Sequence, residues 1–556
     1  MITFLVLSEN KPGVLYRIAD VFLKRKINIQ SLTVAEIDKN LSRFTITAYC
    51  DNANVEKVEK NLYKIIEVVK VTSAYDQELI FKELVIVKVN SASPYAIRDL
   101  DDLIYLHKAE IVYTTESAVY IEKQGTEDDI NSFLNSVRPY GIKEIVRSGR
   151  IGLLKPKNDK KTVDFSLNCP DYIEMLDVSA IKKIEYYSKE FKDVVSLAQG
   201  TPASATDKAI REAAKYAIDK GLVDKYTSGY GIDQLRELLV KKLKHENNLP
   251  NINKNNIIVT HGAAEGLMAI FLALFRRNDE IVVITPDYAS HLTQIRISRK
   301  GGRPVFLPMQ IKNGGWSFSL DKLESIITVN TKAILICNPS NPTGKVYSRE
   351  ELEGILEIAQ KYNLLVITDE IYEKFVYGKK QHISFASLSN AFERTISIFG
   401  FSKSFSMTGW RIGYIVADES IIKNIFKVHD ALITCPTAVS QYAAIAALEN
   451  SDRIVQRLKE EYEEKRKLCI SLLKDNPKIE FAHPDGAYYL FFKIKGVDDD
   501  FKFALRLIEE AGVAIVPGSA FGLGGEGFFR IAFCRERESI IEGIERLNNY
   551  LKKIRL

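Results

Sequence analysis

Residues that mark disulfide-stapled or metal-bound proteins are scarce in this sequence. The six cysteines lie far apart and none forms a CxxC pair, which argues against a zinc ribbon and against a thioredoxin motif. The seven histidines include no HExxH motif and no pair at the i, i+4 spacing of a helix face, so we expect no metal site.

Long hydrophobic runs and a strong charge of one sign are missing as well. Apolar runs such as Ala269–Phe275 fall well short of the ~20 residues that a membrane span needs. The first residues have neither the basic segment nor the small-residue cleavage site of a signal peptide. The net charge of +5 gives no reason to expect nucleic acid or a membrane as the main partner. We therefore expect a reduced, cytoplasmic protein.

The composition is that of an ordinary folded protein with several domains. The chain has 556 residues, of which 46% are hydrophobic and 27% are charged, and this length predicts about three to four domains. The best boundary is Lys155–Thr162, which is polar, charged and proline-containing and lacks apolar periodicity. We predict a linker at 155–162 between a first part, 1–154, and a second part, 163–556.

The apolar pattern of the first part predicts two copies of one α/β unit. In residues 1–76 the apolar pattern predicts the order βαββαβ, which is typical of a ferredoxin-like fold. The expected strands are Ile2–Leu7, Ile29–Ile37, Ser42–Tyr49 and Val68–Thr72, and the helices are Val14–Lys26 and Val55–Ile65. Residues 77–154 repeat the order, with strands at Glu83–Val89, Ile111–Tyr113, Ala118–Glu122 and Ile142–Leu154 and helices at Tyr95–His107 and Asp128–Val137. The exposed edge of such a sheet is suited to pairing with another copy.

The loop Glu9–Leu15 is the candidate binding feature of the first part. It leads into the predicted helix at Val14, where free backbone N–H groups bind carboxylates well. From the residues alone, a plain structural role is the more common explanation, with Pro12-Gly13 as a turn and Asn10 as a helix cap.

The stretch ENKPGVLYRIADVFLKRKINIQSLTVAEIDKNLSRFTI resembles the ACT domain of the acetolactate synthase small, regulatory subunit, and PYGIKEIVRSGRIGLL resembles the end of that subunit's C-terminal domain. The resemblance implies an ACT domain over 1–76 and the C-terminal-like domain over 77–154. It also implies a large acetolactate synthase subunit as a candidate partner. In that family a feedback amino acid, usually valine, binds at a dimer interface, and the matching residues here are Asn10, Gly13, Val14, Leu15 and Asn28. The GDG…N motif with which the catalytic large subunit binds thiamine diphosphate is not found in this sequence.

Small and polar residues follow predicted strands of the second part, at the carboxyl ends where ligands of open α/β sheets bind. His261–Gly266 joins the strand Ile257–Thr260 to a helix, a turn that presents backbone N–H groups to a phosphate. Asn341 lies in a loop with two Asn-Pro pairs after the strand Ala333–Cys337. Asp369 ends a buried apolar strand, and Tyr372 follows three residues later. Each turn taken alone is also explained by packing, by a rigid loop or by a helix cap.

The most specific signal is Gly400–Gly413, GFSKSFSMTGWRIG, which follows the predicted strand Thr395–Phe399. A lysine among aromatic and hydroxyl residues is costly to bury without a purpose. Desolvation lowers the pKa of such a lysine and leaves a neutral amine that can react with a carbonyl group, which makes Lys403 a candidate nucleophile. Arg411, eight residues later, is a natural phosphate partner.

Together these segments resemble a fold-type I, class I/II aminotransferase that uses pyridoxal 5′-phosphate (PLP), over about Val194–Leu551. The resemblance implies a large domain at about 210–450 and a small α/β domain made from about 163–209 and 451–556. It implies that Lys403 bonds to the cofactor and then moves a proton during the reaction. Asp369 would keep the pyridine nitrogen protonated, and Asn341 and Tyr372 would hydrogen-bond the phenolic oxygen of the ring. The expected catalytic residues are Lys403, Asp369 and Tyr372.

Further roles follow from the same resemblance. Tyr288 would stack on the cofactor ring. The phosphate would be held by Ala263, Ala264, Ser402 and Arg411, and by Tyr226 of a neighbouring subunit, which implies a homodimer or a larger homo-oligomer. The family often has serine three residues before the lysine, and this sequence departs from that pattern with Gly400. The substrate α-carboxylate would be bound by Arg530, with Gly200 and Asn341 beside it.

Three hypotheses about function stay open at this stage. The first is an aminotransferase that exchanges an L-amino acid and a 2-oxo acid and is fused to an amino-acid-sensing module, in branched-chain amino acid metabolism. The second keeps the fold and the cofactor but assigns a C–S lyase reaction, since both chemistries use the same lysine and aspartate. In the third, the chain acts chiefly as a regulatory subunit of acetolactate synthase.

Overall fold

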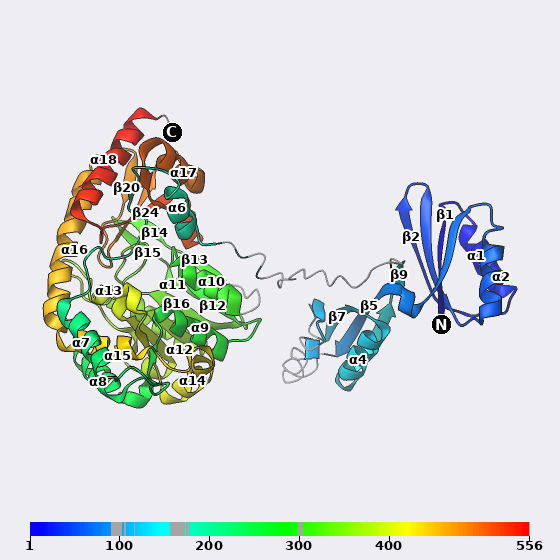
Figure 1. Ribbon diagram of the computed structural model, residues 1–556, viewed down its shortest axis with the longest axis horizontal. Coiled ribbons are helices and arrows are strands. Elements are labelled where there is room, and N and C mark those ends of the chain that lie inside the picture. The colour runs from blue at the N-terminus through cyan, green and yellow to red at the C-terminus, as the bar shows by residue number, and fades with distance from the viewer. Residues whose placement is uncertain are drawn as a thin grey trace. The chain divides into compact units, whose positions relative to one another are not determined.

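The computed structural model describes residues 1–90, 103–104, 107–115, 117–155, 173, 176, 178–298 and 304–554. The chain divides into two compact units, Met1–Ser166 and Leu167–Leu556, whose elements are labelled in Figure 1. The predicted linker beyond Lys155 and most of the helix predicted at Tyr95–His107 lie outside the described residues. The boundaries that we predict for the individual domains stay predictions.

The first sheet has the strand order of a ferredoxin-like fold. Its antiparallel strands run in the order β2-β3-β1-β4. The elements are β1 (Ile2–Glu9), α1 (Val14–Leu23), β2 (Ile29–Asp38), β3 (Leu41–Ala48), α2 (Asn52–Leu62) and β4 (Val68–Tyr75). Both helices cover one face of the sheet (Figure 1), where Phe4, Phe22, Ile46 and Leu62 are buried together. α1 ends at Leu23 and not at the predicted Lys26, because Lys26 has a φ of 57°, which a right-handed helix cannot accommodate.

The second sheet repeats this arrangement. Its strands run in the order β6-β7-β5-β8, so the first strand of the unit again lies between the third and the fourth. The elements are β5 (Leu79–Asn90), β6 (Glu110–Thr115), β7 (Ala118–Gly125), α4 (Glu127–Val137), β8 (Ile142–Arg147) and β9 (Ile151–Leu154). The single closing strand predicted at Ile142–Leu154 is wrong, because Gly149 has a φ of 76° and breaks it into β8 and β9. A Cβ atom at Gly149 would lie 2.4 Å from Oγ of Ser31, so this turn is also packed against β2.

The second unit is built on a seven-stranded sheet with the order β11-β19-β18-β17-β16-β12-β13. Among its described strands, only β19 runs antiparallel to its neighbours. The strands are β11 (Ile257–Thr260), β12 (Glu280–Thr285), β13 (Pro304–Pro308), β16 (Thr331–Cys337), β17 (Leu365–Asp369), β18 (Thr395–Gly400) and β19 (Gly413–Val416). Alternate residues enter two different cores, as Val366 and Ile367 do, so the strands are buried on both faces.

A smaller sheet, β20-β21-β24-β23, completes the second unit. Its strands are β20 (Ile479–Phe481), β21 (Tyr489–Ile494), β23 (Val516–Pro517) and β24 (Phe528–Ala532). β10 (Val195–Ser196) pairs in parallel with β22 (Val513–Ala514), which joins the start of the unit to its end. A short hairpin is formed by β14 (Gln310–Lys312) and β15 (Gly315–Ser317).

The helices of the second unit surround these sheets (Figure 1). They are α6 (Ala180–Ser188), α7 (Lys208–Asp219), α8 (Asp233–Glu246), α9 (Ala263–Leu274), α10 (Ala289–Ser298), α11 (Leu320–Ser325), α12 (Arg349–Lys361), α13 (Phe401–Ser404), α14 (Glu419–Ile433), α15 (Ala438–Glu449), α16 (Ser451–Leu473), α17 (Asp500–Ala511) and α18 (Arg537–Lys553).

Candidate active site

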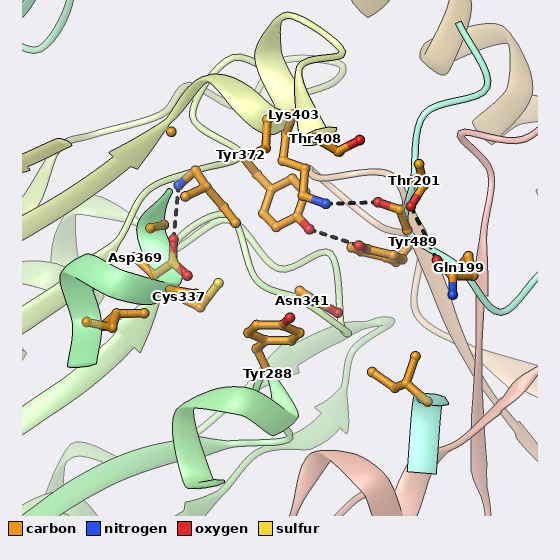
Figure 2. Close-up of a pocket in the computed structure, with 18 of the residues that line it drawn as sticks. Gln199, Thr201, Tyr288, Cys337, Asn341, Asp369, Tyr372, Lys403, Thr408 and Tyr489 are labelled. Atoms are coloured by element: carbon orange, nitrogen blue, oxygen red, sulfur yellow. Dashed lines mark hydrogen bonds between the residues drawn. The ribbon is translucent and has the colours of Figure 1, made fainter. Parts of the chain in front are cut away.

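One cavity of about 260 Å³ in the second unit is lined by most of the cofactor-site and substrate-site residues predicted from the sequence (Figure 2). It lies at the carboxyl ends of β16, β17 and β18, whose last residues Cys337, Asp369 and Gly400 line it. The predicted residues that line it are Gly200, Ala263, Ala264, Tyr288, Asn341, Asp369, Tyr372, Ser402, Lys403, Arg411 and Arg530. Tyr226 does not line it, and its side chain is 84% exposed.

Lys403 lies in α13, directly after β18. Its Nζ donates a hydrogen bond to the carbonyl oxygen of Gly200 at 2.9 Å, and Figure 2 shows Lys403 among the residues that line the cavity. Burial lowers the pKa of Lys403 to about 8, and the positive charges of Arg530 and Arg411 act in the same direction. At pH 7 about a tenth of this amine is therefore uncharged, far more than for an ordinary lysine, and a nucleophile requires the uncharged form.

Asp369 ends β17, and its carboxylate is held by a histidine that our sequence analysis missed. Oδ1 accepts the backbone N–H of Ile371 at 3.1 Å, and Oδ2 lies 3.0 Å from Nε2 of His291. The other ring nitrogen of His291, Nδ1, lies 2.7 Å from Oδ2 of Asp287. Burial opposes a charged ring, but the carboxylates of Asp287 and Asp369 outweigh it and raise the pKa of His291 to about 10. The buried, positively charged ring of His291 therefore fixes the orientation of the Asp369 carboxylate.

Three tyrosines and an asparagine form the next part of the wall. The hydroxyl oxygens of Tyr372 and Tyr489 lie 2.8 Å apart, and burial raises the pKa of both hydroxyls, so both stay protonated near neutral pH. Tyr489, in β21, is a second residue that the sequence analysis missed. Tyr288 is half-buried and meets His291 edge to face, with ring centroids 5.3 Å apart. Figure 2 shows Tyr288, Tyr372 and Asn341 around one space.

The first turn of α9 and Arg411 form one end of the cavity. No side chain caps α9, so the N–H groups of Ala263 and Ala264 have no acceptor within the helix. Gly262, which precedes them, has a φ of 78°, and a Cβ atom there would lie 2.7 Å from Nη2 of Arg411. Only glycine at this position leaves room for the guanidinium beside the start of the helix. Backbone donors next to an arginine suit a phosphate group.

Arg530 is the most deeply buried cation of the cavity, with 2% of its surface exposed. Nη1 donates to Oδ1 of Asn341 at 3.0 Å and Nη2 donates to the carbonyl oxygen of Ala198 at 2.6 Å. Its Nε is buried without a hydrogen-bond partner in the described chain. Both hydrogen-bond partners of Arg530 are uncharged. The positive charge of its guanidinium can therefore bind a carboxylate. Close by, a Cβ atom at Gly200 would lie 1.9 Å from the hydroxyl oxygen of Tyr489, so only glycine fits there.

The residues that were predicted to bind a regulatory amino acid lie around the start of α1 and the start of β2. Gly13 is the N-cap of α1 with a φ of 85°, and no side chain caps this helix. Asn10 does not cap it, since its Oδ1 accepts a hydrogen bond from Oγ of Ser42 at 2.9 Å. Val14 is buried in the core, whereas Leu15 is 46% exposed and Asn28 is exposed. The Val14 N–H already donates to the carbonyl oxygen of Lys11 at 3.4 Å, and Oδ1 of Asn10 is held by Ser42, whereas Asn28 is exposed.

The residues of the cavity fit PLP. The cofactor needs an amine for its carbonyl carbon, an acid opposite its pyridine nitrogen and donors for its phosphate. Lys403, Asp369 and the Arg411–α9 turn supply these three groups in one cavity. The fold and the cavity thus define a PLP-dependent enzyme of fold type I.

Comparison with known proteins identifies the family. The family model described as aminotransferase class I and II matches residues 192–547. The aspartate aminotransferase of Pyrococcus abyssi is 37% identical, over 69% of this chain and 99% of the relative. The aromatic-amino-acid aminotransferase 2 of Thermococcus litoralis is 36% identical over the same shares. The chain belongs to the class I and II aminotransferases, and it is a PLP-dependent aminotransferase that acts on amino acids and 2-oxo acids.

Solved structures agree with this assignment. The aspartate aminotransferase of Thermus thermophilus with maleate superimposes with a TM-score of 0.65 at 31% identity, covering 68% of this chain and 99% of that one. An aromatic aminotransferase from Pyrococcus horikoshii gives a TM-score of 0.62 at 36% identity, covering 66% and 99%.

The first unit matches different models. One described as an AHAS small subunit-like ACT domain matches residues 4–70, and one described as the small subunit of acetolactate synthase matches residues 82–156. The chain is therefore a fusion of an acetolactate synthase small-subunit module with an aminotransferase, as the sequence predicted. Within the described residues, no helix has the length and apolar composition needed to cross a membrane.

Proposed function

We propose that PLP binds with its phosphate between the first turn of α9 and Arg411, its ring between Tyr288 and the end of β17, and its reactive carbon at Lys403. The observation that carries this proposal is the single cavity shared by Lys403, Asp369 and Arg411. Ala263, Ala264 and Ser402 would contribute to the phosphate site. The cavity residue in the place of the family's frequent serine is Gly400, which has no hydroxyl to offer.

When bound, PLP supplies a carbonyl carbon that takes up the amino group and a ring that accepts the electrons of the broken Cα–H bond. The Asp369 carboxylate, held by His291, keeps a proton on the ring nitrogen. The Tyr372 hydroxyl and the Asn341 amide orient the phenolic oxygen. The Lys403 amine, once free, is the base that removes the proton from Cα of the amino donor. It then returns this proton to the carbon atom that PLP contributes.

The reactivity of Lys403 is expected to follow its lowered pKa. A lysine attacks a carbonyl only as the neutral amine, so the rate at which apoenzyme bonds to PLP should rise with pH up to about 8 and then level off. Stopped-flow absorbance measures this rate, with Lys403→Ala as the unreactive control. A rate that keeps rising about tenfold per pH unit towards the ordinary lysine pKa of about 10.4 would contradict the assignment.

We propose that the substrate α-carboxylate binds Arg530, beside Gly200 and Asn341, and that the amino donor is a branched-chain amino acid. The fused acetolactate synthase module favours this donor class, while the curated relatives are aspartate and aromatic-amino-acid aminotransferases. A panel of amino donors assayed with 2-oxoglutarate and pyruvate decides between these classes. Release of pyruvate from cystathionine, measured in parallel, tests the C–S lyase hypothesis.

For the first unit we propose feedback binding of a branched-chain amino acid at the start of α1. Asn10 and Asn28 would bind the amino acid with their side chains, and Gly13, Val14 and Leu15 with their backbone. Calorimetry with the full chain is expected to show saturable binding of valine, leucine or isoleucine and its loss in Asn28→Ala. Lys64→Ala, an exposed change on the same unit, should bind normally. The proposal fails if none of the three amino acids binds.

We further propose that the enzyme is at least a homodimer in the cytoplasm. Tyr226 is exposed on its own subunit, as a residue that completes a neighbour's phosphate site would be. Free thiols at Cys50, Cys337, Cys435, Cys469 and Cys534 suit a reducing compartment. Light scattering measures the oligomeric state, and a pull-down tests a large acetolactate synthase subunit as a second partner.

A further inference from the structure

His429 is a buried histidine outside the cavity that connects two segments of the proposed cofactor site. It lies in α14 and has no exposed surface. Nδ1 lies 3.0 Å from Oε1 of Glu265, and Nε2 lies 3.0 Å from the carbonyl oxygen of Gly229. Glu265 is in the first turn of α9, and Gly229 belongs to the segment Tyr226–Gly231. One ring therefore bridges the start of the phosphate-binding helix and the segment that carries Tyr226.

Glu265 holds the turn that leads into α9. Its second oxygen, Oε2, accepts the backbone N–H of His261 at 3.1 Å, while Oε1 faces His429. This carboxylate lies next to Ala264 in the sequence, and its side chain is only 12% exposed. A negative charge in the turn that receives the phosphate would repel that phosphate unless a partner offsets it.

The Tyr226–Gly231 segment is fixed by the same face of α14. Phe426, one turn before His429, stacks on Tyr230 with ring centroids 3.7 Å apart and planes 4° apart. A Cβ atom at Gly229 would lie 3.0 Å from the Phe426 ring, so the backbone is packed tightly there. From α15, Nε2 of Gln441 donates to Oγ1 of Thr227 at 2.9 Å. These contacts hold the segment in place, so a hydrogen bond to Gly229 also positions the neighbouring residues of the segment.

The chemistry of the two partners fixes what the ring must supply. Both partner atoms are oxygens that accept hydrogen bonds, so a ring N–H is the group that would serve either of them. A ring N–H directed at Glu265 presents a partial positive charge to that carboxylate.

We propose that His429 is a positioning residue that offsets the Glu265 charge and ties the first turn of α9 to the Tyr226 segment, so that the turn accepts the cofactor phosphate. This inference rests on the proposed placement of the PLP phosphate at this turn. Without His429, the Glu265 carboxylate would weaken binding of the cofactor phosphate. The two residues can therefore be tested as a pair.

Titration of apoenzyme with PLP, followed by absorbance, tests the inference. His429→Gln is expected to raise the dissociation constant of PLP about tenfold or more, because the Glu265 carboxylate loses the ring N–H that offsets its charge. The double variant Glu265→Gln/His429→Gln should bind within about threefold of the wild type, since no charge is left to offset. Glu265→Gln alone should bind PLP at least as tightly as the wild type. His245→Gln, the same change at an exposed histidine of α8, is the matched control and should leave binding unchanged.

The outcomes separate the inference from the proposed function. If the wild type binds no PLP, the proposed function fails. If the wild type binds but His429→Gln binds equally well, or if the double variant is as weak as His429→Gln, the inference is overturned, since a purely structural role would give no rescue. Should His429→Gln not fold, a tenfold weaker binding of PLP by Glu265→Gln alone would overturn it.

Discussion

Replacing Lys403 with alanine is expected to lower kcat/KM for transamination by about 10⁴-fold or more, because the variant loses both the amine that bonds to PLP and the base that moves the proton. The structure gives the reason for this size. Lys403 is the one lysine among the described residues that line the cavity, and burial lowers its pKa to about 8, which makes the uncharged amine accessible. Steady-state kinetics with the best amino donor from the panel would measure the loss.

Two controls make the Lys403 result specific. Lys423→Ala, which removes an exposed lysine of α14, should retain full activity. Addition of a small primary amine to Lys403→Ala should restore part of the rate, because the amine can replace the missing proton carrier in the space that the side chain leaves. A Lys403→Ala enzyme with more than about a hundredth of the wild-type kcat/KM would contradict the role of this residue.

Replacing Arg530 with glutamine is expected to raise KM for the amino acid by about 10³-fold, the size of losing one partner of a buried charge pair. Arg530 reaches the cavity from β24 with only uncharged partners, Asn341 and Ala198, so a bound carboxylate completes its charge balance. Arg530→Lys should recover part of the loss, because it keeps the charge but not the planar fork.

The substrate provides the sharper control for Arg530. The wild type should discriminate strongly between an amino acid and its amide, which lacks the carboxylate charge, and Arg530→Gln should lose that discrimination. Equal discrimination by both enzymes would show that the α-carboxylate binds elsewhere. Thermal denaturation of the variant distinguishes a specific binding defect from a general loss of stability.

The sequence correctly indicated the site residues that lie at the ends of strands. Asp369 and Lys403 follow apolar runs that could only be buried strands, and the carboxyl ends of neighbouring parallel strands meet at one edge. The βαββαβ order of the first part could also be predicted, because the spacing of apolar residues differs clearly between strands and helices.

The missed residues depend on contacts between distant segments. His291 meets Asp369 across 78 residues of sequence and Tyr489 meets Tyr372 across 117. Neither pair has a local pattern, because the partners are brought together only when β12, β17 and β21 are assembled. The family resemblance pointed to Tyr288, but nothing local showed that Asp287 and His291 would support Asp369. The split of β8 from β9 was missed because Gly149 was not recognised as a turn.

The central claim, that this aminotransferase carries PLP on Lys403, is tested most directly by borohydride reduction of the purified protein followed by peptide mass mapping. We predict a single PLP-modified peptide, the one that contains Lys403, and none in Lys403→Ala. PLP fixed instead at another buried lysine such as Lys242 or Lys345, or no PLP on any peptide, would contradict the account.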